Sequence, residues 1–249
     1  MPHLNPTVMA KDAKRIQTSF LNGVERKALV WLANRQPKWV TSDLLTWTGT
    51  LGAALFALGY ILTYLNINWL WLSTFGLIVN WYGDSLDGTL ARVRKTQRPI
   101  YGYYLDHTVD GINETLMFLG LGLSPLMNLY LALAMLVVYL QLTLNVSMNA
   151  HLKSEFKLTY AGLGPTEFRV LAILLNTLLI FITPWRQFEQ VCTIFDKTVF
   201  LHALDYPGFV ILAALCLIYG VTVWRDARYY AKIDPMPGPE DDSQTKARE

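Results

Sequence analysis

The chain has 249 residues, which is enough for one domain or at most two. Hydrophobic residues make up 53% and charged residues 16%, whereas a soluble domain carries about 25% charged residues. With a net charge of only +2, this composition argues against a soluble enzyme, gives no basis for nucleic-acid binding and predicts a polytopic membrane protein.

The N-terminal segment, residues 1–43, precedes the first long apolar stretch. Within it, residues 11–36 are predicted to form an amphipathic helix, because apolar side chains fall on one face with basic residues around it. That face comprises Ile16, Phe20, Val24, Ala28 and Trp31. Such a helix lies either along the membrane surface or against the rest of the protein, and the sequence leaves both positions open.

Six stretches approach the length of about 20 apolar residues that a bilayer core requires of a helix. They cover residues 44–65, 69–91, 103–123, 126–148, 166–182 and 208–224. No strand-like alternation competes with them. The predicted fold is an all-α integral membrane protein, with six transmembrane helices in residues 44–233 and an N-terminal interfacial amphipathic helix. Residues 234–249 are predicted to be a disordered tail.

The distribution of basic residues predicts the orientation of the helices. Of the 21 Lys and Arg residues, 18 lie before the first stretch, between the second and third, between the fourth and fifth, or after the sixth. The opposite connections hold Arg186 and Lys197, and Arg169 lies in the first turn of the fifth stretch. Both termini and the longer polar connections are therefore expected in the cytoplasm.

Charged and small residues interrupt the second and third stretches at regular intervals. The pattern is Asp84-x2-Asp87-Gly88-x2-Ala91-Arg92, then nine residues, then Gly102-x3-Asp106-x3-Asp110. On helices these spacings put each half of the pattern on one face. The short basic connection makes the two helices antiparallel neighbours, so we expect four carboxylates to meet at the cytoplasmic membrane boundary.

Four carboxylates at that depth repel one another and are costly to desolvate, so positive charge is expected among them. Oxygen ligands without His or Cys suit Mg²⁺ or Mn²⁺, and two such ions would balance four negative charges. Gly88 and Ala91 leave room for a flat, bulky ligand, and Arg92 suits a phosphate. The pattern therefore predicts a site for a nucleotide diphosphate and two divalent ions.

These residues resemble the signature of the CDP-alcohol phosphatidyltransferases at every fixed position, with nine residues before the second glycine where the family usually has about eight. The resemblance implies an enzyme of phospholipid synthesis, commonly a homodimer, that works with Mg²⁺ or Mn²⁺. Such an enzyme moves a substituted phosphate from a CDP-linked donor to an alcohol hydroxyl and releases CMP.

The resemblance also implies individual roles. Asp84, Asp87 and Asp106 would be metal ligands, and Asp110 would be both a ligand and the general base toward the acceptor hydroxyl. The residues implied in contacts with the cytidine and diphosphate, or in closing their pocket, are Gly88, Ala91, Arg92 and Gly102.

Two residues near this pattern are candidates for binding the acceptor. Glu114 lies one turn beyond Asp110 on the same face, and an ionisable residue inside a span is either functional or held by packing. Arg169 is near the cytoplasmic end of the fifth stretch. It would bind an anionic acceptor or a lipid phosphate, pair with Glu167, or extend toward the membrane surface.

The substrates remain open between two branches of the family. The chain length favours CDP-diacylglycerol with a small polar alcohol. However, Asp106-His107 is similar to the Asp-His pair of the branch that joins CDP-choline or CDP-ethanolamine to diacylglycerol, in which His107 would be a candidate base. An ion-coupled transporter is a further alternative, but it would place acidic residues near mid-membrane in several helices, and here they cluster on two.

Overall fold

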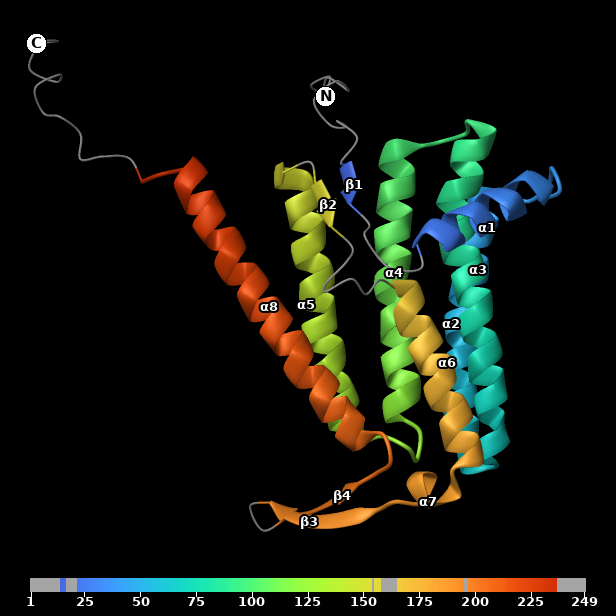
Figure 1. Ribbon diagram of the computed structural model, residues 1–249, viewed down its shortest axis with the longest axis vertical. Helices are drawn as coiled ribbons and strands as arrows, with labels where there is room; N and C mark the ends of the chain where they lie inside the picture. Colours follow the sequence, from blue (N-terminus) through green and yellow to red (C-terminus); the bar gives the residue numbers. More distant parts are fainter. Residues whose placement is uncertain (1–13, 17–21, 154, 158–164, 195–196, 237–249) are drawn as a thin grey trace, which may run out of the picture.

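Long helices dominate the computed structural model, which describes residues 14–16, 22–153, 155–157, 165–194 and 197–236. These long helices are α2 (Ser42–Ile61), α3 (Leu70–Arg94), α4 (Pro99–Gly122), α5 (Leu129–Lys153), α6 (Pro165–Phe181) and α8 (Asp205–Ile233). They run lengthwise beside one another, and α8 diverges from α5 toward its C-terminal end (Figure 1). Each predicted apolar stretch corresponds to one of them.

Part of this bundle has the dimensions of membrane spans. Segments Ser42–Tyr64, Leu129–Asn149 and Asp205–Ile233 are long and apolar enough to cross a membrane, judged by length and composition. By contrast, α3 and α4 carry the charged pattern, and α6 has 17 residues. The helical membrane-protein class is confirmed, while the count of six spans, the domain limits and the cytoplasmic termini stay predictions.

The ends of the helices follow local sequence signals. The hydroxyl of Thr41 accepts a 3.2 Å hydrogen bond from the backbone N–H of Leu44, which caps α2. Short turns η2 (Leu62–Tyr64) and η3 (Ile67–Trp69) connect α2 to α3. Pro99 starts α4, a position that suits its fixed backbone angle. The helix thus begins four residues before the predicted stretch and includes Gly102 in its first turn.

Two small two-stranded sheets lie outside the six predicted stretches. Strand β1 (Lys14–Ile16) pairs in parallel with β2 (Glu155–Lys157), and β3 (Gln190–Ile194) pairs antiparallel with β4 (Lys197–Leu201). The β3–β4 hairpin follows the short helix α7 (Thr183–Arg186) and lies across the end of the bundle opposite the basic connections (Figure 1). Its strands are rich in β-branched residues, which favour extended backbone.

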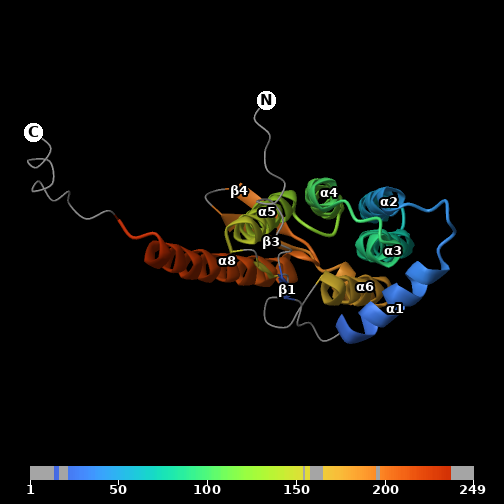
Figure 2. The same cartoon turned by 90° about the horizontal axis from the view of Figure 1, so that it is seen from above.

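Helix α1 (Asn22–Arg35) lies across α3 and the start of α6, as Figure 2 shows. The predicted helix was wrong at its start, where Lys14–Ile16 is a strand, while residues 11–13 and 17–21 lie outside the described part. Its predicted apolar face is not the face that packs. Leu29 and Ala33 are buried, whereas Val24 and Trp31 are 71% and 54% exposed. Thus α1 lies against the protein, and contact of its outer face with lipid stays a prediction.

The exposed surface of the bundle is apolar, as expected of helices that contact lipid. On α8, for example, Val210 and Leu217 are 71% and 68% exposed. This helix ends at Ile233. Residues 237–249 of the predicted tail lie outside the described residues.

The backbones of α2 and α3 approach each other closely at small residues. A Cβ atom added to Gly76 would lie 2.5 Å from the backbone nitrogen of Phe56 and 2.6 Å from the carbonyl oxygen of Gly52. A Cβ on Gly83 would collide with the backbone of α2. Helix α2 also packs against α4, whereas α3 and α4 make few direct backbone contacts in the described part of the chain. The two helices of the acidic pattern are therefore held by a common neighbour.

Candidate functional site

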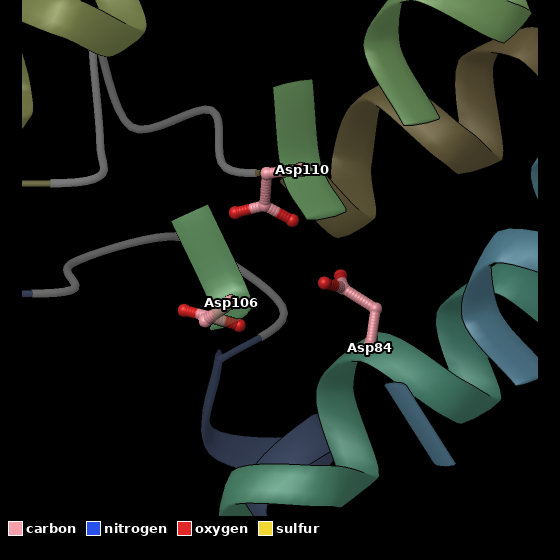
Figure 3. Close-up of side chains that lie close together, drawn as sticks. All are labelled: Asp84, Asp106 and Asp110. Atoms are coloured by element: carbon pink, nitrogen blue, oxygen red, sulfur yellow. The ribbon is translucent and has the colours of Figure 1, made fainter. Parts of the chain in front are cut away.

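Three acidic side chains meet in the space between α3 and α4. One carboxylate oxygen from each of Asp84, Asp106 and Asp110 lies within 4.8 Å of the others. Asp84 projects from α3, and Asp106 and Asp110 project from successive turns of α4 (Figure 3). All three residues are half-buried. The structure thus brings together three of the four predicted aspartates, and we refer to them as the acidic cluster.

Asp87 lies outside the acidic cluster and is held by its own contacts. Its Oδ2 accepts a 2.7 Å hydrogen bond from the hydroxyl of Thr46, and its Oδ1 accepts one from the backbone N–H of Gly88. The residue is buried, at 8% exposure. Its role as a fourth metal ligand stays a prediction.

Arg169 pairs with the acidic cluster through Asp84. Its Nη2 group donates a 2.6 Å hydrogen bond to Asp84 Oδ2, and its Nε group donates a 3.0 Å hydrogen bond to Oδ1 of Asn80. Of the alternatives open from the sequence, neither pairing with Glu167 nor extension to the surface describes these contacts. The acidic cluster on α3 and α4 is therefore joined to a third helix, α6, through Arg169.

The glycines of the pattern leave open space beside the acidic cluster. A Cβ atom added to Gly88 would meet only the Nη1 atom of Arg92, at 3.5 Å. A Cβ atom added to Gly102 would have no atom of the described residues within 4 Å of it. Arg92 donates a 3.0 Å hydrogen bond from Nη2 to the hydroxyl of Thr89. A guanidinium group thus lies next to an open glycine face, which suits a bulky anionic ligand.

The helix ends beside the site are joined by arginines of the basic connection. Arg94 donates hydrogen bonds to the backbone carbonyls of Gln36, Pro37 and Val40. Arg98 donates to both carboxylate oxygens of Asp43 at the start of α2. Hydrogen bonding to Asp43 raises the pKa of the Arg98 guanidinium above its usual value, so this surface pair stays charged.

The two other candidates on α4 have different surroundings. The Nδ1 atom of His107 lies 3.0 Å from the carbonyl oxygen of Tyr103 and 3.8 Å from Asp106 Oδ2. Glu114 Oε1 accepts a 3.2 Å hydrogen bond from the hydroxyl of Thr143 on α5. Glu114 Oε2 is buried and has no hydrogen-bond partner among the described residues. Neither side chain belongs to the acidic cluster.

The donor set of the acidic cluster fits a hard divalent cation. Its ligand atoms are carboxylate oxygens from two helices, and such oxygens are the preferred ligands of Mg²⁺ and Mn²⁺ in proteins. Arg169 brings one positive charge, so further positive charge is needed to balance three carboxylates. The identity and number of the ions stay predictions.

Residues 39–224, which include α2 to α6 and much of α8, match the family model described as CDP-alcohol phosphatidyltransferase. The chain belongs to this family. The resemblance inferred from the spacing of the acidic pattern is thereby confirmed, and the transporter alternative loses its support.

The CDP-alcohol phosphatidyltransferase chain is also similar to a phosphatidylinositol phosphate synthase of Cutibacterium acnes. The two are 36% identical over 84 residues, which is 34% of this chain and 38% of the relative. The matched part thus spans well under half of either protein.

Sequence reasoning missed two residues that hold charged side chains at the site of this family member. Asn80, only 2% exposed, holds Arg169. Its position one turn before Asp84 inside an apolar stretch was a usable signal. Thr46, which holds Asp87, gave no such signal, because threonine is common in apolar helices.

Proposed function

We propose that the protein transfers a substituted phosphate from a CDP-linked donor, CDP-diacylglycerol, to the hydroxyl of a small polar alcohol and releases CMP. The observation that carries this proposal is the acidic cluster next to the open faces of Gly88 and Gly102. The family assignment supports a CDP-linked donor. We place the site at the cytoplasmic face, because most basic residues lie in the connections at that end of the bundle.

The side chains of the site have distinct tasks in this reaction. Asp84, Asp87, Asp106 and Asp110 would hold two Mg²⁺ or Mn²⁺ ions, which supply positive charge that stabilises the diphosphate and the leaving CMP. Arg92 binds a phosphate of the donor beside Gly88, and Ala91 and Gly102 leave room for the cytidine. The proposed nucleotide contacts are therefore Gly88, Ala91, Arg92 and Gly102.

Asp110 is the general base. Its carboxylate takes the proton of the acceptor hydroxyl, whose oxygen then attacks the phosphorus that carries the diacylglycerol. The new phosphorus–oxygen bond forms as the bond to the CMP phosphate breaks, and CMP leaves with the electron pair. Asp110 is suited to this task because, within the acidic cluster, one of its carboxylate oxygens lies within 4.8 Å of those of Asp84 and Asp106.

The acceptor that we propose is a phosphorylated polyol. The name of the Cutibacterium acnes relative, phosphatidylinositol phosphate synthase, supports a phosphate-bearing acceptor. Arg169 would bind its phosphate. Glu114 would accept hydrogen bonds from its hydroxyls, because the buried Oε2 atom has no other donor among the described residues. We also propose that the protein is a homodimer, on the family resemblance.

A donor-by-acceptor screen tests this function. The purified protein in lipid nanodiscs would receive CDP-diacylglycerol, CDP-choline or CDP-ethanolamine with candidate alcohols, and mass spectrometry would detect CMP and the lipid product. We expect product from CDP-diacylglycerol with a phosphorylated polyol, only when Mg²⁺ or Mn²⁺ is present. Asp106→Ala should abolish it, and the exposed Asp234→Asn should not. Product from diacylglycerol and CDP-choline would instead assign the chain to the aminoalcohol branch.

A further inference from the structure

The ion pair between Arg169 and Asp84 joins the proposed acceptor side to the proposed metal side. The side chains are 17% and 25% exposed, so water screens their charges only in part. Asp84 Oδ2, which accepts from Arg169, belongs to a carboxylate that is also within 4.8 Å of Asp106 and Asp110. Arg169 and a divalent ion are therefore competing cations for one carboxylate.

Asn80 holds the inner end of this guanidinium in place. The amide nitrogen of Asn80 donates a 3.0 Å hydrogen bond to the carbonyl of Gly49, which directs Oδ1 of the amide toward Nε of Arg169. Asn80 is 2% exposed, at the close contact of α2 and α3. Asn80 thus holds the Nε atom of Arg169, and Asp84 holds its Nη2 atom, so the two ends of the guanidinium have different partners.

We propose that Arg169 is an internal counter-ion that exchanges Asp84 for a phosphate group when a divalent ion binds, so that metal binding and phosphate capture are coupled. A divalent ion at Asp84 weakens the ion pair through competition for the carboxylate and through repulsion of the guanidinium. The released guanidinium offers a planar fork of donors that matches a phosphate. This proposal rests on the proposed function and adds an order of binding to it.

Coupling of this kind is reciprocal: a bound divalent ion raises the affinity for phosphate, and bound phosphate raises the affinity for the ion by the same factor. Removing the charge of Arg169 should strengthen metal binding, whereas a purely structural arginine would leave metal binding unchanged or weaken it. A unit charge roughly 6 Å from a divalent ion changes the affinity by about tenfold even at the dielectric constant of water. We therefore expect at least about tenfold tighter Mn²⁺ binding in Arg169→Gln.

The first experiment measures Mn²⁺ binding without any donor, by the loss of the free-ion EPR signal on titration of protein in phosphatidylcholine nanodiscs. Arg169→Lys keeps the charge and should bind Mn²⁺ nearly as the wild type does. Arg186→Gln removes a charge from α7, beyond the opposite end of α6, and should have no effect. Equal or weaker binding in Arg169→Gln than in the wild type would overturn the proposal.

The second experiment substitutes Asp84, the ion-pair partner of Arg169, and so does not depend on the folding of Arg169→Gln. Asp84→Asn and Asp106→Asn each remove one negative charge from the acidic cluster, but only Asp84 is hydrogen-bonded to Arg169. In EDTA, inorganic phosphate should raise the melting midpoint of Asp84→Asn clearly more than that of Asp106→Asn. Equal responses would show that general charge, and not release of Arg169, governs phosphate binding, and would refute the coupling.

Two further comparisons separate the possible outcomes. In nanodiscs of anionic lipid, loss of the phosphate response of Asp84→Asn would identify a lipid headgroup as the phosphate that Arg169 binds, and a retained response would identify a soluble phosphate. If the wild type binds no Mn²⁺, or binds it as Asp106→Asn does, the metal site of the proposed function fails. If the wild type binds Mn²⁺ more tightly than Asp106→Asn does, but Arg169→Gln binds it no more tightly than the wild type, the metal site stands and the coupling alone fails.

Discussion

Asp106→Asn is expected to have opposite effects on stability with and without divalent ions. Without ions, the carboxylates of Asp106 and Asp110 repel each other, with one oxygen of each within 4.8 Å. Two unit charges at that separation interact by about 1 kcal/mol in water and by about 3.5 kcal/mol at an effective dielectric constant of 20. The substitution removes this repulsion, so the protein in EDTA should become more stable by an amount in that range.

With ions, the order should reverse. A ligand present at about 100 times its dissociation constant stabilises the folded state by about 2.7 kcal/mol, and Asp106→Asn loses a charged ligand. Thermal unfolding in detergent, followed by the fluorescence of the eight tryptophans, measures both states. A change of 1 kcal/mol shifts the midpoint by about 2–4 °C for a protein of this size. The variant should melt at least about 2 °C above the wild type in EDTA and below it in saturating Mn²⁺.

Two control variants isolate the cause of this reversal. Asp234→Asn removes an exposed charge after α8 and should behave as the wild type in both conditions. Asp84→Asn leaves Arg169 without its ion pair, so it should gain no stability in EDTA. If Asp106→Asn and the wild type melt together in EDTA, or respond alike to Mn²⁺, the electrostatic account of the acidic cluster is wrong.

The other predictions concern the base, a buried network and the close helix contact. Asp110→Asn should bind the CDP-linked donor while its turnover falls by about 10²–10⁴-fold, the usual effect of losing a general base. The turnover of His107→Ala should fall less. A larger fall in His107→Ala than in Asp110→Asn, measured by rapid mixing, would assign the base to His107. Tyr60→Phe removes the 2.5 Å hydrogen bond that the tyrosine hydroxyl donates to the fully buried Asn176. Because the amide oxygen then loses its donor, the free energy of unfolding, measured by denaturant titration, should fall by about 1–3 kcal/mol. Gly83→Ala should push α3 away from α2, lowering the melting midpoint and activity together; retention of both would contradict the close contact.

The helices of the acidic pattern were predictable because their information is local. Residues spaced by three and four positions share a helix face wherever the helix lies, so Asp84 on α3 and Asp106 and Asp110 on α4 were correctly grouped. The separation of α3 from α4 was not predictable. It depends on α2, which packs against both helices. The spacing of residues within α3 or α4 does not predict which other helix packs against them.

Contacts between distant segments were the part that the sequence left open. Arg169 had several chemically reasonable partners, and the choice of Asp84 depends on how α6 packs beside α3. The same holds for α1, which has apolar residues on more than one side. Only its packing shows that Leu29 faces the protein and Trp31 faces outward. The strands were missed because short extended segments between long apolar helices give weak patterns.

The order of the helices along the chain has a consequence for biosynthesis. A chain is made from its N-terminus, so α2, α3 and α4 leave the ribosome before α6. The three aspartates of the acidic cluster are thus translated before Arg169. If the cluster assembles in that interval at the cytoplasmic face that we propose for the site, divalent ions are the available charge to neutralise it. Ion depletion should therefore harm newly made chains more than finished ones, which already contain their own arginine.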